Sequence, residues 1–380
     1  MLTVFWRFFI LGLTSFGGPA AHLGYFRVLF VERLKWLDEE AYARLVALSQ
    51  FLPGPSSSQV GFAIGFRRAG WPGGIAAFVG FTTPSFLLLL ALSAAGASIG
   101  DDSRFVGVVH GLKLLAVVVV ADAVIKMYGA FCRDRATAAM AVATAAALLI
   151  APGLAAQFGA LIVAAALGAV LLRGAPADAR PEGRIRPLEI VLFCLLFVGL
   201  PLAAGRAAEL RLFGDFYHAG SLVFGGGHVV LPLLQNALGE TVSTDRFLLG
   251  YAAAQAIPGP MFSLSAFLGA ELLPAAPLLG AGLATIAIFL PGFLLLVGLI
   301  GAWERITSSP RVAGAAAGLN AAVVGLLLSA LYQPVFRSAV EGPSDVAVVL
   351  VGAFLLMKMR APVLGLVAFF GLAGLGRSLL

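Results

Sequence analysis

The sequence predicts an all-α polytopic membrane protein, and three observations lead to this fold class. First, 60% of the 380 residues are hydrophobic and only 12% are charged, whereas soluble domains carry about 25% charged residues. Second, long apolar stretches follow one another along most of the chain, and stretches of about 20 apolar residues predict transmembrane helices. Third, prolines and glycines interrupt these stretches at corresponding places in the two halves of the chain, which is typical of transporters with broken helices.

The sharpest interruption of the helical pattern lies at residues 50–55. This stretch, Gln-Phe-Leu-Pro-Gly-Pro, lies in an apolar region and is followed by four polar residues at 56–59. A helix cannot continue undisturbed through it, because each proline removes a backbone donor and clashes with the preceding turn. At membrane depth, such a break requires protein or a polar cavity to satisfy its backbone groups. The stretch recurs as Gln-Ala-Ile-Pro-Gly-Pro at 255–260.

The first half of the chain, residues 1–172, combines apolar segments with one charged stretch. Its first apolar segment, 5–26, is interrupted by Gly and Pro at 17–19. Residues 27–44 are charged and amphipathic, and they predict an interfacial helix. The other predicted helical segments are 45–66, 71–97, 105–128, 137–150 and 154–172.

The middle of the chain separates the two halves. Residues 173–187 are rich in Pro, Gly, Arg and acidic residues and predict a cytoplasmic linker. Residues 188–204 predict one connecting transmembrane helix, and residues 205–380 form the second half. The apolar segments of the second half are 213–234, 247–270, 278–302, 312–332, 346–357 and 362–377.

The two halves are predicted to be repeats of one another. The Phe-Gly-Gly motif at 16–18 recurs 208 residues later, and the Pro-Gly-Pro motif at 53–55 recurs 205 residues later. Pro84 and Pro291 are 207 residues apart, and so are two Gly-Leu pairs that begin at positions 111 and 318. Four landmarks in the same order at a nearly constant offset indicate an internal duplication, which many secondary transporters contain.

The charged residues indicate that the second repeat is inverted in the membrane. The loop at 27–44 contains four Lys or Arg residues, whereas the corresponding loop around 236–246 contains only Arg246. The Arg pair at 67–68 corresponds to an uncharged Leu pair at 272–273. Since cytoplasmic loops carry the excess of Lys and Arg, corresponding loops are expected on opposite sides of the membrane.

The same charges predict how the broken segments enter the bilayer. Basic residues flank the first Pro-Gly-Pro segment on both sides, at Arg44 and at the pair 67–68. If both ends are cytoplasmic, the segment enters the membrane, breaks and returns. We therefore predict an inverted repeat with about 9 full spans and four re-entrant broken hairpins, two entering from each side. The alternative is roughly 10–13 full spans that are kinked by proline.

These motifs resemble those of the chromate transporter family. The first half has Phe-Gly-Gly-Pro-Ala-Ala-His at 16–22, Glu-Arg-Leu-Lys-Trp-Leu at 32–37 and Gln-Phe-Leu-Pro-Gly-Pro at 50–55. The second half has Phe-Gly-Gly-Gly-His-Val-Val-Leu-Pro at 224–232 and Gln-Ala-Ile-Pro-Gly-Pro at 255–260. The resemblance covers nearly the whole chain, in the long, two-halved form of the family.

The resemblance implies a secondary transporter that exports chromate from the cytoplasm and confers chromate resistance. The family is linked to proton-coupled exchange, so the implied partners are protons and chromate or a sulfate-like oxyanion. An integral protein of the cytoplasmic (plasma) membrane is implied, with the lipid bilayer as its surroundings and a homodimer left open. An oxyanion channel, or a transporter of a different anion, is the alternative, because broken helices also line pores.

The candidate substrate site is built from the four broken segments. A tetrahedral dianion needs convergent donors and positive potential, and a half-helix N-terminus offers free N–H groups and the positive end of a dipole. Glycine lets the backbone approach closely, and Ser and Gln side chains can donate hydrogen bonds. The alternatives are close helix packing for the glycines and back-bonding to helix carbonyls for the serines. The predicted substrate-binding residues are Gly17, Gly18, Gln50, Gly54, Ser56, Ser57, Gly225, Gly226, Gln255, Gly259 and Ser263.

Four ionisable residues are candidates for coupling, since charge at membrane depth is costly and usually functional. His22 and His228 follow the two glycine motifs, and a buried, hydrogen-bonded histidine is the alternative for each. Glu271 ends the second broken segment and is either a coupling carboxylate or an interfacial residue. Lys113 lies next to the first paired Gly-Leu and is either a substrate-attracting charge or a snorkelling side chain.

Other classes of function have little support in the sequence. The four histidines contain no HExxH or similar pair, and Cys132 and Cys194 do not form a CxxC pair, so we expect no metal and no cofactor. No GxSxG motif occurs, and an enzyme is not expected. The net charge of +6 is scattered over loops, which indicates cytoplasmic loops rather than a nucleic-acid partner.

Overall fold

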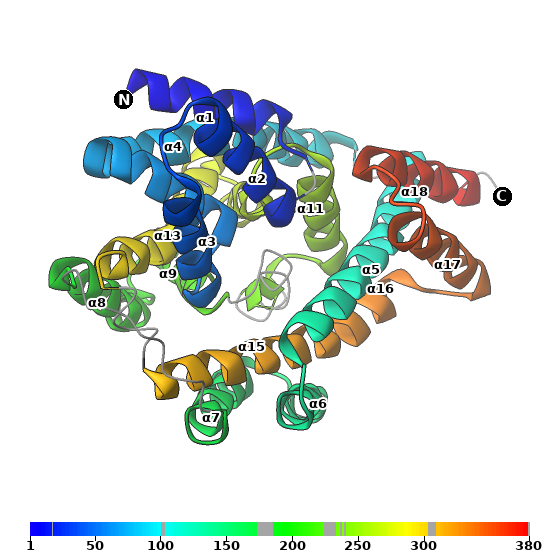
Figure 1. The fold of residues 1–380 in the computed structure, drawn as a ribbon. Coiled ribbons are helices and arrows are strands. Elements are labelled where there is room, and N and C mark those ends of the chain that lie inside the picture. Colours follow the sequence, from blue (N-terminus) through cyan, green and yellow to red (C-terminus); the bar gives the residue numbers. More distant parts are fainter. Residues whose placement is uncertain are drawn as a thin grey trace.

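The computed structural model is entirely helical in the part of the chain that it describes. The described residues are 1–16, 18–99, 103–172, 185–223, 233–235, 238, 241–302 and 309–378. They contain sixteen α-helices together with short π-helical and 3₁₀ segments, and no strand occurs among them. The predicted all-α class is confirmed (Figure 1).

The first half and the connecting segment contribute eight of the α-helices. In chain order these are α1 (Leu2–Thr14), α2 (Gly18–Phe26), α3 (Glu39–Phe51), α4 (Ser56–Ile99), α5 (Ser103–Phe131), α6 (Arg135–Ile150), α7 (Leu154–Leu171) and α8 (Pro187–Ala203). A π-helix, η1 (Arg27–Arg33), follows α2. The helix α8 occupies the segment that was predicted as the connecting helix.

The second half contributes the other eight. They are α9 (Ala208–Leu222), α11 (Thr244–Ala256), α12 (Leu264–Leu272), α13 (Pro277–Leu299), α15 (Pro310–Ala330), α16 (Arg337–Ala339), α17 (Pro343–Met357) and α18 (Val363–Ser378). A 3₁₀ turn, η4 (Met261–Ser263), precedes α12, and a π-helix, η5 (Leu331–Phe336), follows α15.

The charged stretch at 27–44 is not one interfacial helix, and that prediction was wrong. The stretch is divided between η1 and the first turns of α3, with a connection at 34–38 that is not part of either helix. The Asp38 carboxylate accepts a hydrogen bond from the Ala41 backbone N–H (2.7 Å). Because this N-cap residue has an extended backbone, a new helix begins here and the preceding one does not continue.

Two tight helical hairpins lie near the centre of the molecule. In the first, α4 reverses at 69–70, so that it consists of a short arm, 56–68, and a long arm, 71–99. Glycines let the two arms touch, because a methyl group at Gly65 would lie 2.3 Å from the Gly73 carbonyl oxygen. Each arm is therefore a separate helix, in agreement with the separate apolar segments predicted from the sequence.

The second half contains the same arrangement between α12 and α13. A methyl group at Gly269 would lie 2.3 Å from the Gly280 carbonyl oxygen. Both hairpins begin shortly after a Pro-Gly-Pro stretch, and in both a pair of glycines lies where the two arms contact each other. Small residues of this kind allow helix backbones to pack closely in membranes.

Four described helical segments are long and apolar enough to cross a bilayer: Ser56–Ala95, Val106–Phe131, Pro277–Leu299 and Pro310–Ala339. The first includes the reversal in α4, so its long arm supplies the required length. Seven other apolar helices have between 10 and 17 residues, fewer than the about 20 that one crossing requires. These are the proportions of a helical membrane protein, whereas the total of about 9 spans and the re-entrant hairpins stay predictions.

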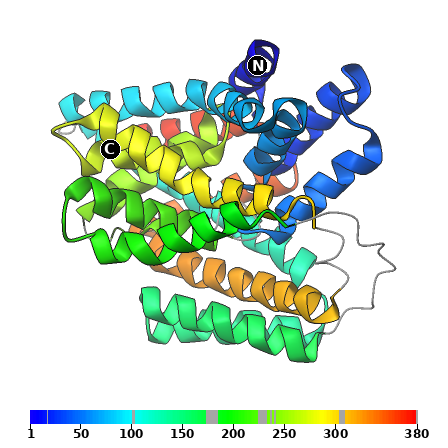
Figure 2. The same ribbon diagram turned by 90° about the vertical axis from the view of Figure 1, so that its left-hand side faces the viewer.

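The last helix of each half packs against the other half, so the two helices are exchanged between the halves. α18 packs along α5 of the first half (Figure 1), and α7 packs along α15 of the second half (Figure 2). A methyl group at Gly111 would lie 1.9 Å from the Phe370 carbonyl oxygen, and one at Gly318 would lie 2.1 Å from the Ala164 carbonyl oxygen. Gly111 and Gly318 are corresponding positions of the predicted repeat, so the two exchanged contacts are equivalent.

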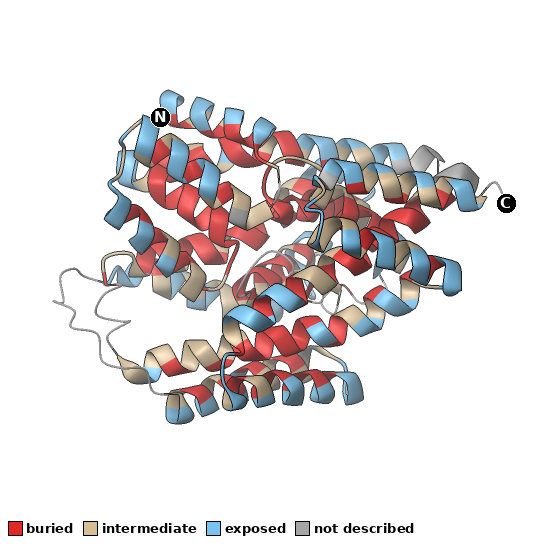
Figure 3. Cartoon of the chain, turned by 45° about the vertical axis from the view of Figure 1, so that its right-hand side comes forward, coloured by how far each residue is buried: buried red, intermediate tan, exposed pale blue. Residues whose placement is uncertain are grey.

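The core lies between the hairpins and is rich in aromatic side chains. Buried residues face the middle of the molecule and exposed residues face outward along each helix (Figure 3). Phe62 of α4 stacks on Phe293 of α13, with ring centroids 4.3 Å apart, and joins the two halves. Large apolar side chains such as Ile150 and Leu202 are also more than four-fifths exposed, which is typical of surfaces that contact lipid.

A substitution at the exchanged contact tests this packing. Gly111→Val is expected to destabilise the protein by about 1–3 kcal/mol, because the new side chain overlaps the backbone of α18. The apparent midpoint of thermal unfolding, followed by tryptophan fluorescence in detergent, should fall. Gly129→Val on the same helix is the control, because nothing lies within 4 Å of a methyl group at Gly129. Equal midpoints for the two variants would contradict the exchanged arrangement.

Candidate functional site

Both Pro-Gly-Pro stretches interrupt the helices. The first break, residues 52–55, separates α3 from α4, and the second break, residues 257–260, separates α11 from η4. Gly54 and Gly259 have φ angles of +122° and +103°. Side chains disfavour this backbone conformation, and glycine adopts it without steric cost. Glycine therefore lets the chain turn sharply between two half-helices at both breaks.

Each break is hydrogen-bonded to the opposite half of the chain. The Gly54 N–H donates to the Val223 carbonyl oxygen (2.6 Å), and the Gly259 N–H donates to the Ser15 carbonyl oxygen (3.0 Å). Ser15 follows α1 and Val223 follows α9, in each case directly before a Phe-Gly-Gly motif. The two bonds therefore join corresponding positions, and each break lies against the end of a helix of the other half.

Gln59 holds the first break against α13. Its Nε2 donates to the Pro53 carbonyl oxygen (2.9 Å) and to the Gly292 carbonyl oxygen (3.1 Å), and the side chain is fully buried. A methyl group at Gly54 would lie 3.0 Å from Gln59 Nε2 and from the Gly292 Cα. The first break is thus in close contact with a long helix of the second half.

The second break has the equivalent contact with the long arm of α4. A methyl group at Gly259 would lie 2.9 Å from Ser85 Oγ, and Ser85 Oγ is hydrogen-bonded to Ser263 Oγ (2.6 Å). Ser85 and Gly292 each directly follow a proline inside a long helix. Each long helix therefore passes the opposite break just after its internal proline, where a helix is readily bent.

His22 lies where the end of α1 and the start of α4 meet the second break. Its Nε2 is 3.3 Å from the Ser15 carbonyl oxygen, its Nδ1 is 3.3 Å from Ser57 Oγ, and the residue is fully buried. Since a carbonyl oxygen only accepts, Nε2 carries a proton, and in the neutral ring Nδ1 accepts from the Ser57 hydroxyl. The same Ser15 carbonyl oxygen accepts the Gly259 N–H. His22 is therefore buried and hydrogen-bonded at the junction of the breaks.

The other predicted substrate residues have different surroundings. Ser56 is buried at the start of α4, and Gln50 is half-buried in the last turn of α3. Gly18 has a φ of +75°, and nothing lies within 4 Å of a methyl group added there. Gln255 Nε2 lies 2.9 Å from Met261 Sδ. Four further predicted residues lie outside the described part of the chain: Gly17, Gly225, Gly226 and His228.

Unused hydrogen-bonding capacity remains close to the breaks. α4 begins directly after the first break, and the first N–H groups of a helix have no intrahelical acceptor. Several side-chain atoms here are buried and have no partner among the described residues, although buried polar groups are usually paired. These atoms are the hydroxyls of Ser15, Ser58 and Thr82 and Oε1 of Gln59. The centre therefore differs from ordinary helix packing, because three hydroxyls and one amide oxygen have unused hydrogen-bonding capacity there.

The second break offers less of this capacity than the first. In η4 the Ser263 N–H donates to the Pro260 carbonyl oxygen (2.9 Å). The 3₁₀ turn therefore occupies this N–H group with an intrahelical hydrogen bond. The corresponding N–H group after the first break lies in the first turn of an α-helix. The two breaks are similar in backbone conformation but unequal as donors.

Several polar residues of the centre are not among the predicted site residues. Ser15 and Gln59 contact a break directly, and so does Ser85, whereas Thr82 lies one turn before Ser85. A signal for them existed, because each is a polar residue beside a Gly or Pro landmark in an apolar segment.

Glu271 and Lys113 are engaged in ion pairs. Arg246 Nε donates to Glu271 Oε2 (3.0 Å), and Ser93 Oγ donates to the other oxygen of the same carboxylate. Lys113 Nζ donates to Asp245 Oδ1 (2.6 Å). Each charge is therefore balanced by a partner in this conformation, and a coupling role for either residue stays a prediction.

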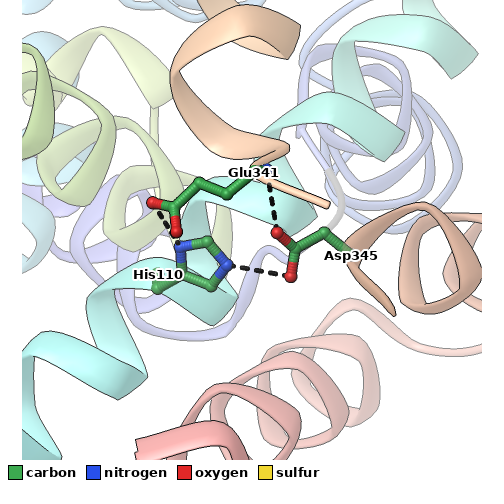
Figure 4. A group of neighbouring side chains, drawn as sticks. All are labelled: His110, Glu341 and Asp345. Carbon is green, nitrogen blue, oxygen red and sulfur yellow. Dashed lines mark hydrogen bonds and ion pairs between the residues drawn. The ribbon is translucent and has the colours of Figure 1, made fainter. Parts of the chain in front are cut away.

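Three side chains that could ligate a metal meet between α5 and α17. His110, Glu341 and Asp345 each place one ligand atom within 4.8 Å of the others (Figure 4). Arg377 of α18 donates to both Asp345 oxygens (2.9 and 3.0 Å) and to Glu341 Oε2 (2.6 Å). A guanidinium on both carboxylates occupies their lone pairs and repels a metal cation. We interpret the cluster as an ion-pair network that stabilises the packing of the exchanged helix α18 against α5.

Removing the buried carboxylate tests this interpretation. Asp345→Ala removes the buried carboxylate from Arg377 and His110 and leaves them only the exposed Glu341, so we expect the free energy of unfolding to fall by about 1–3 kcal/mol. Glu341→Ala is the control, since its side chain is 56% exposed and exposed pairs contribute about 0–1 kcal/mol. The readout is the apparent thermal midpoint in detergent. A rise of the wild-type midpoint on adding Zn²⁺, absent in Asp345→Ala, would contradict the ion-pair interpretation.

The motifs and their geometry agree with a known family. A family model described as chromate transporter matches residues 2–171 and 210–375. The chain belongs to the chromate transporter family. The family resemblance predicted from the motifs is confirmed, and the chain is a membrane transporter rather than an enzyme.

Individual members of the family are similar over most of the chain. A chromate transport protein of Pseudomonas aeruginosa is 29% identical in an alignment 346 residues long, which covers 85% of this chain and 78% of that protein. A chromate transport protein of Cupriavidus metallidurans is 27% identical in an alignment 382 residues long, gaps included, which covers 95% of this chain and 92% of that protein. An uncharacterised transporter of Methanocaldococcus jannaschii is 24% identical over 370 residues, covering 94% and 90%. No solved structure matches the chain.

Proposed function

We propose that this chain is a secondary transporter that exports chromate, or a sulfate-like oxyanion, across the cytoplasmic membrane. Transport is coupled to the proton gradient and confers chromate resistance. The observation that carries the proposal is the pair of hydrogen bonds from Gly54 to Val223 and from Gly259 to Ser15, which gathers the broken segments at one polar centre. Family membership and the similarity to chromate transport proteins support chromate as the substrate.

The chemistry of the centre supports an oxyanion ligand. Chromate and sulfate are tetrahedral dianions, which several converging neutral donors can bind. The start of α4 supplies free N–H groups and the positive end of a helix dipole, and Ser56 and Ser57 are buried there. Transporters with discontinuous helices bind anionic groups at half-helix N-termini near the bilayer midplane. The proposed site therefore lies between the first repeat, 1–172, and the second repeat, 205–380.

An inverted relation between the repeats has geometric support. Phe66 and Glu271 correspond in the predicted repeat. Phe66 lies against Trp71 (ring centroids 6.1 Å) at the start of the long arm of α4, whereas Glu271 accepts from Ser93 on the same arm. Ser93 follows Trp71 by 22 positions, a rise of about 33 Å along a helix, which is close to the about 30 Å of a bilayer core. The outer ends of the two broken hairpins thus lie one membrane thickness apart.

His22 is the proposed link to protons. In the neutral ring, the Ser57 hydroxyl hydrogen is used on Nδ1. A second proton on the ring would make both nitrogens donors, so the Ser57 hydroxyl would be free to donate to an anion. Protonation would also add a positive charge beside the bound dianion. Proton and anion binding are therefore coupled through one contact, and the pH dependence of transport measures that coupling.

Transport itself is tested with everted membrane vesicles, in which export becomes uptake. Vesicles that contain the protein should take up labelled chromate, and an imposed pH gradient should change the initial rate at least threefold. A protonophore should remove the change. Vesicles without the protein are the control. An initial rate of uptake that does not depend on the pH gradient would favour the channel. The absence of any chromate or sulfate uptake would contradict the transporter.

The proposed binding residues are tested in the same vesicles. Ser57→Ala and Gln50→Ala should each lower the initial rate of chromate uptake at least tenfold, because a donor to the dianion is lost, and the variants should remain folded. Ser329→Ala is the control, since this buried serine bonds back to the Leu326 carbonyl oxygen of its own helix. Wild-type rates in both Ser57→Ala and Gln50→Ala would contradict the proposed site.

A further inference from the structure

A cavity of about 530 Å³ opens at one end of the molecule, beside the first broken hairpin. Three arginines from separate elements line it: Arg44 from α3, Arg67 from the end of the short arm of α4, and Arg186 from the start of α8. None of the described residues that line the cavity is acidic. Three guanidinium groups around one cavity, drawn from distant parts of the sequence, create a local excess of positive charge.

Two of the three arginines, Arg67 and Arg186, have no acidic partner among the described residues. Arg44 is paired with Glu40 (2.9 Å), whose side chain is 81% exposed, so water screens this pair. The Arg186 guanidinium lies over the Phe66 ring (5.1 Å to the centroid). Arg67 is exposed and forms no ion pair within the described part of the chain. Arg67 and Arg186 therefore keep their positive charge available to a ligand in the cavity.

The cavity lies on the way to the first break. α13 touches Gly54 at Gly292, and Ile300, eight residues further on, lines the cavity. Eight residues of α-helix span about 12 Å. On the other side, Leu48 of α3 lines the cavity and precedes the first break by only a few residues. The walls of the cavity thus continue directly into the broken segments.

The opposite end of the molecule has a different balance of charge. There, beside Ser93, the Arg246 guanidinium is bound to the Glu271 carboxylate. The arginine at the outer end of the second hairpin is therefore neutralised by an acidic partner. In the sequence, the Arg pair at 67–68 corresponds to two leucines in the second half. A cavity at this end is lined by Arg206 and Arg211 but also by the carboxylate of Asp215, so the excess of arginine over acidic side chains is larger in the cavity of Arg44, Arg67 and Arg186.

We propose that Arg44, Arg67 and Arg186 form a vestibule that captures a tetrahedral oxyanion dianion before it reaches the break. The inference rests on the proposed transport function and adds the site of substrate entry. Guanidinium groups match oxyanions with two parallel hydrogen bonds. A cleft with one sign of charge raises the local concentration of the opposite ion and the rate of its capture. The loop-charge pattern places this vestibule on the cytoplasmic side, where export begins.

The vestibule is tested by the concentration dependence of uptake into everted vesicles. Arg67→Gln should raise the KM for chromate at least fivefold and change the maximal rate less than twofold, because capture is weakened and the break is intact. Arg68→Gln is the matched control: Arg68 is the next residue, lies over the Trp36 ring (5.3 Å) and does not line the cavity. Raising the ionic strength should raise the wild-type KM more than that of Arg67→Gln, because salt screens exposed charge.

The result that overturns the vestibule differs from the one that overturns transport. Equal KM values for Arg67→Gln and Arg68→Gln in a transporting protein would contradict the vestibule and leave the transport proposal standing. If the wild type transports no oxyanion, the transport proposal fails. In that case direct binding decides the vestibule: sulfate should protect Arg67, but not Arg68, from modification by phenylglyoxal, as read by mass spectrometry, and absence of protection overturns it.

The protection experiment also separates a free oxyanion from a lipid phosphate. Both offer tetrahedral anionic oxygens to the arginines. In nanodiscs of phosphatidylcholine alone, protection of Arg67 by sulfate should persist. Protection that appears only when phosphatidylglycerol is added, with no effect of sulfate, would mean that the cavity binds lipid headgroups and would contradict a substrate vestibule.

Discussion

The fold depends on the two backbone hydrogen bonds that tie each Pro-Gly-Pro break to the opposite half of the chain. A break in a helix frees N–H and C=O groups, and in a bilayer each unsatisfied group costs several kcal/mol. Gly54 and Gly259 find their acceptors at Val223 and Ser15, which end the first helices of the other half. Neither half can satisfy its own break alone. The two halves must therefore assemble before either broken hairpin is stable at membrane depth.

The same dependence extends outward from the centre. The exchanged helices α7 and α18 each pack on a long helix of the other half, at the corresponding glycines Gly318 and Gly111. The two long helices pass the opposite breaks at Ser85 and Gly292. Any movement of one half against the other must therefore change the hydrogen bonds at the breaks. In a transporter this is useful, because the contacts that hold the substrate site are the contacts that a rocking motion would open.

Much of this arrangement could be predicted from Gly and Pro alone, because these residues act through local backbone restrictions. The breaks, the two long helices with internal prolines and the equivalent contacts at Gly111 and Gly318 lie where the repeated landmarks placed them. The charged stretch at 27–44 was misjudged, because its amphipathic pattern hid the helix start that Asp38 caps. The partners of the breaks were beyond sequence reasoning. A single serine or glutamine has no periodicity, and Ser85 and Gln59 contact their partners only because chain segments 178 and 233 residues away lie beside them.

The placement of charge in the proposed mechanism follows from the need both to capture a dianion and to release it. At low dielectric, the attraction between unit charges a few ångströms apart is many times larger than in water. Three arginines at the break would hold chromate too firmly for turnover. They lie instead around a cavity that is open to water, where attraction is screened and exchange is fast. The break offers hydroxyls, backbone N–H groups and one histidine whose charge depends on a proton. The charged arginines therefore lie where water weakens their attraction for the anion, and neutral donors lie at the buried break, where the attraction of a full charge would be strongest. The anion is captured in the open cavity and then bound at a site from which it can be released.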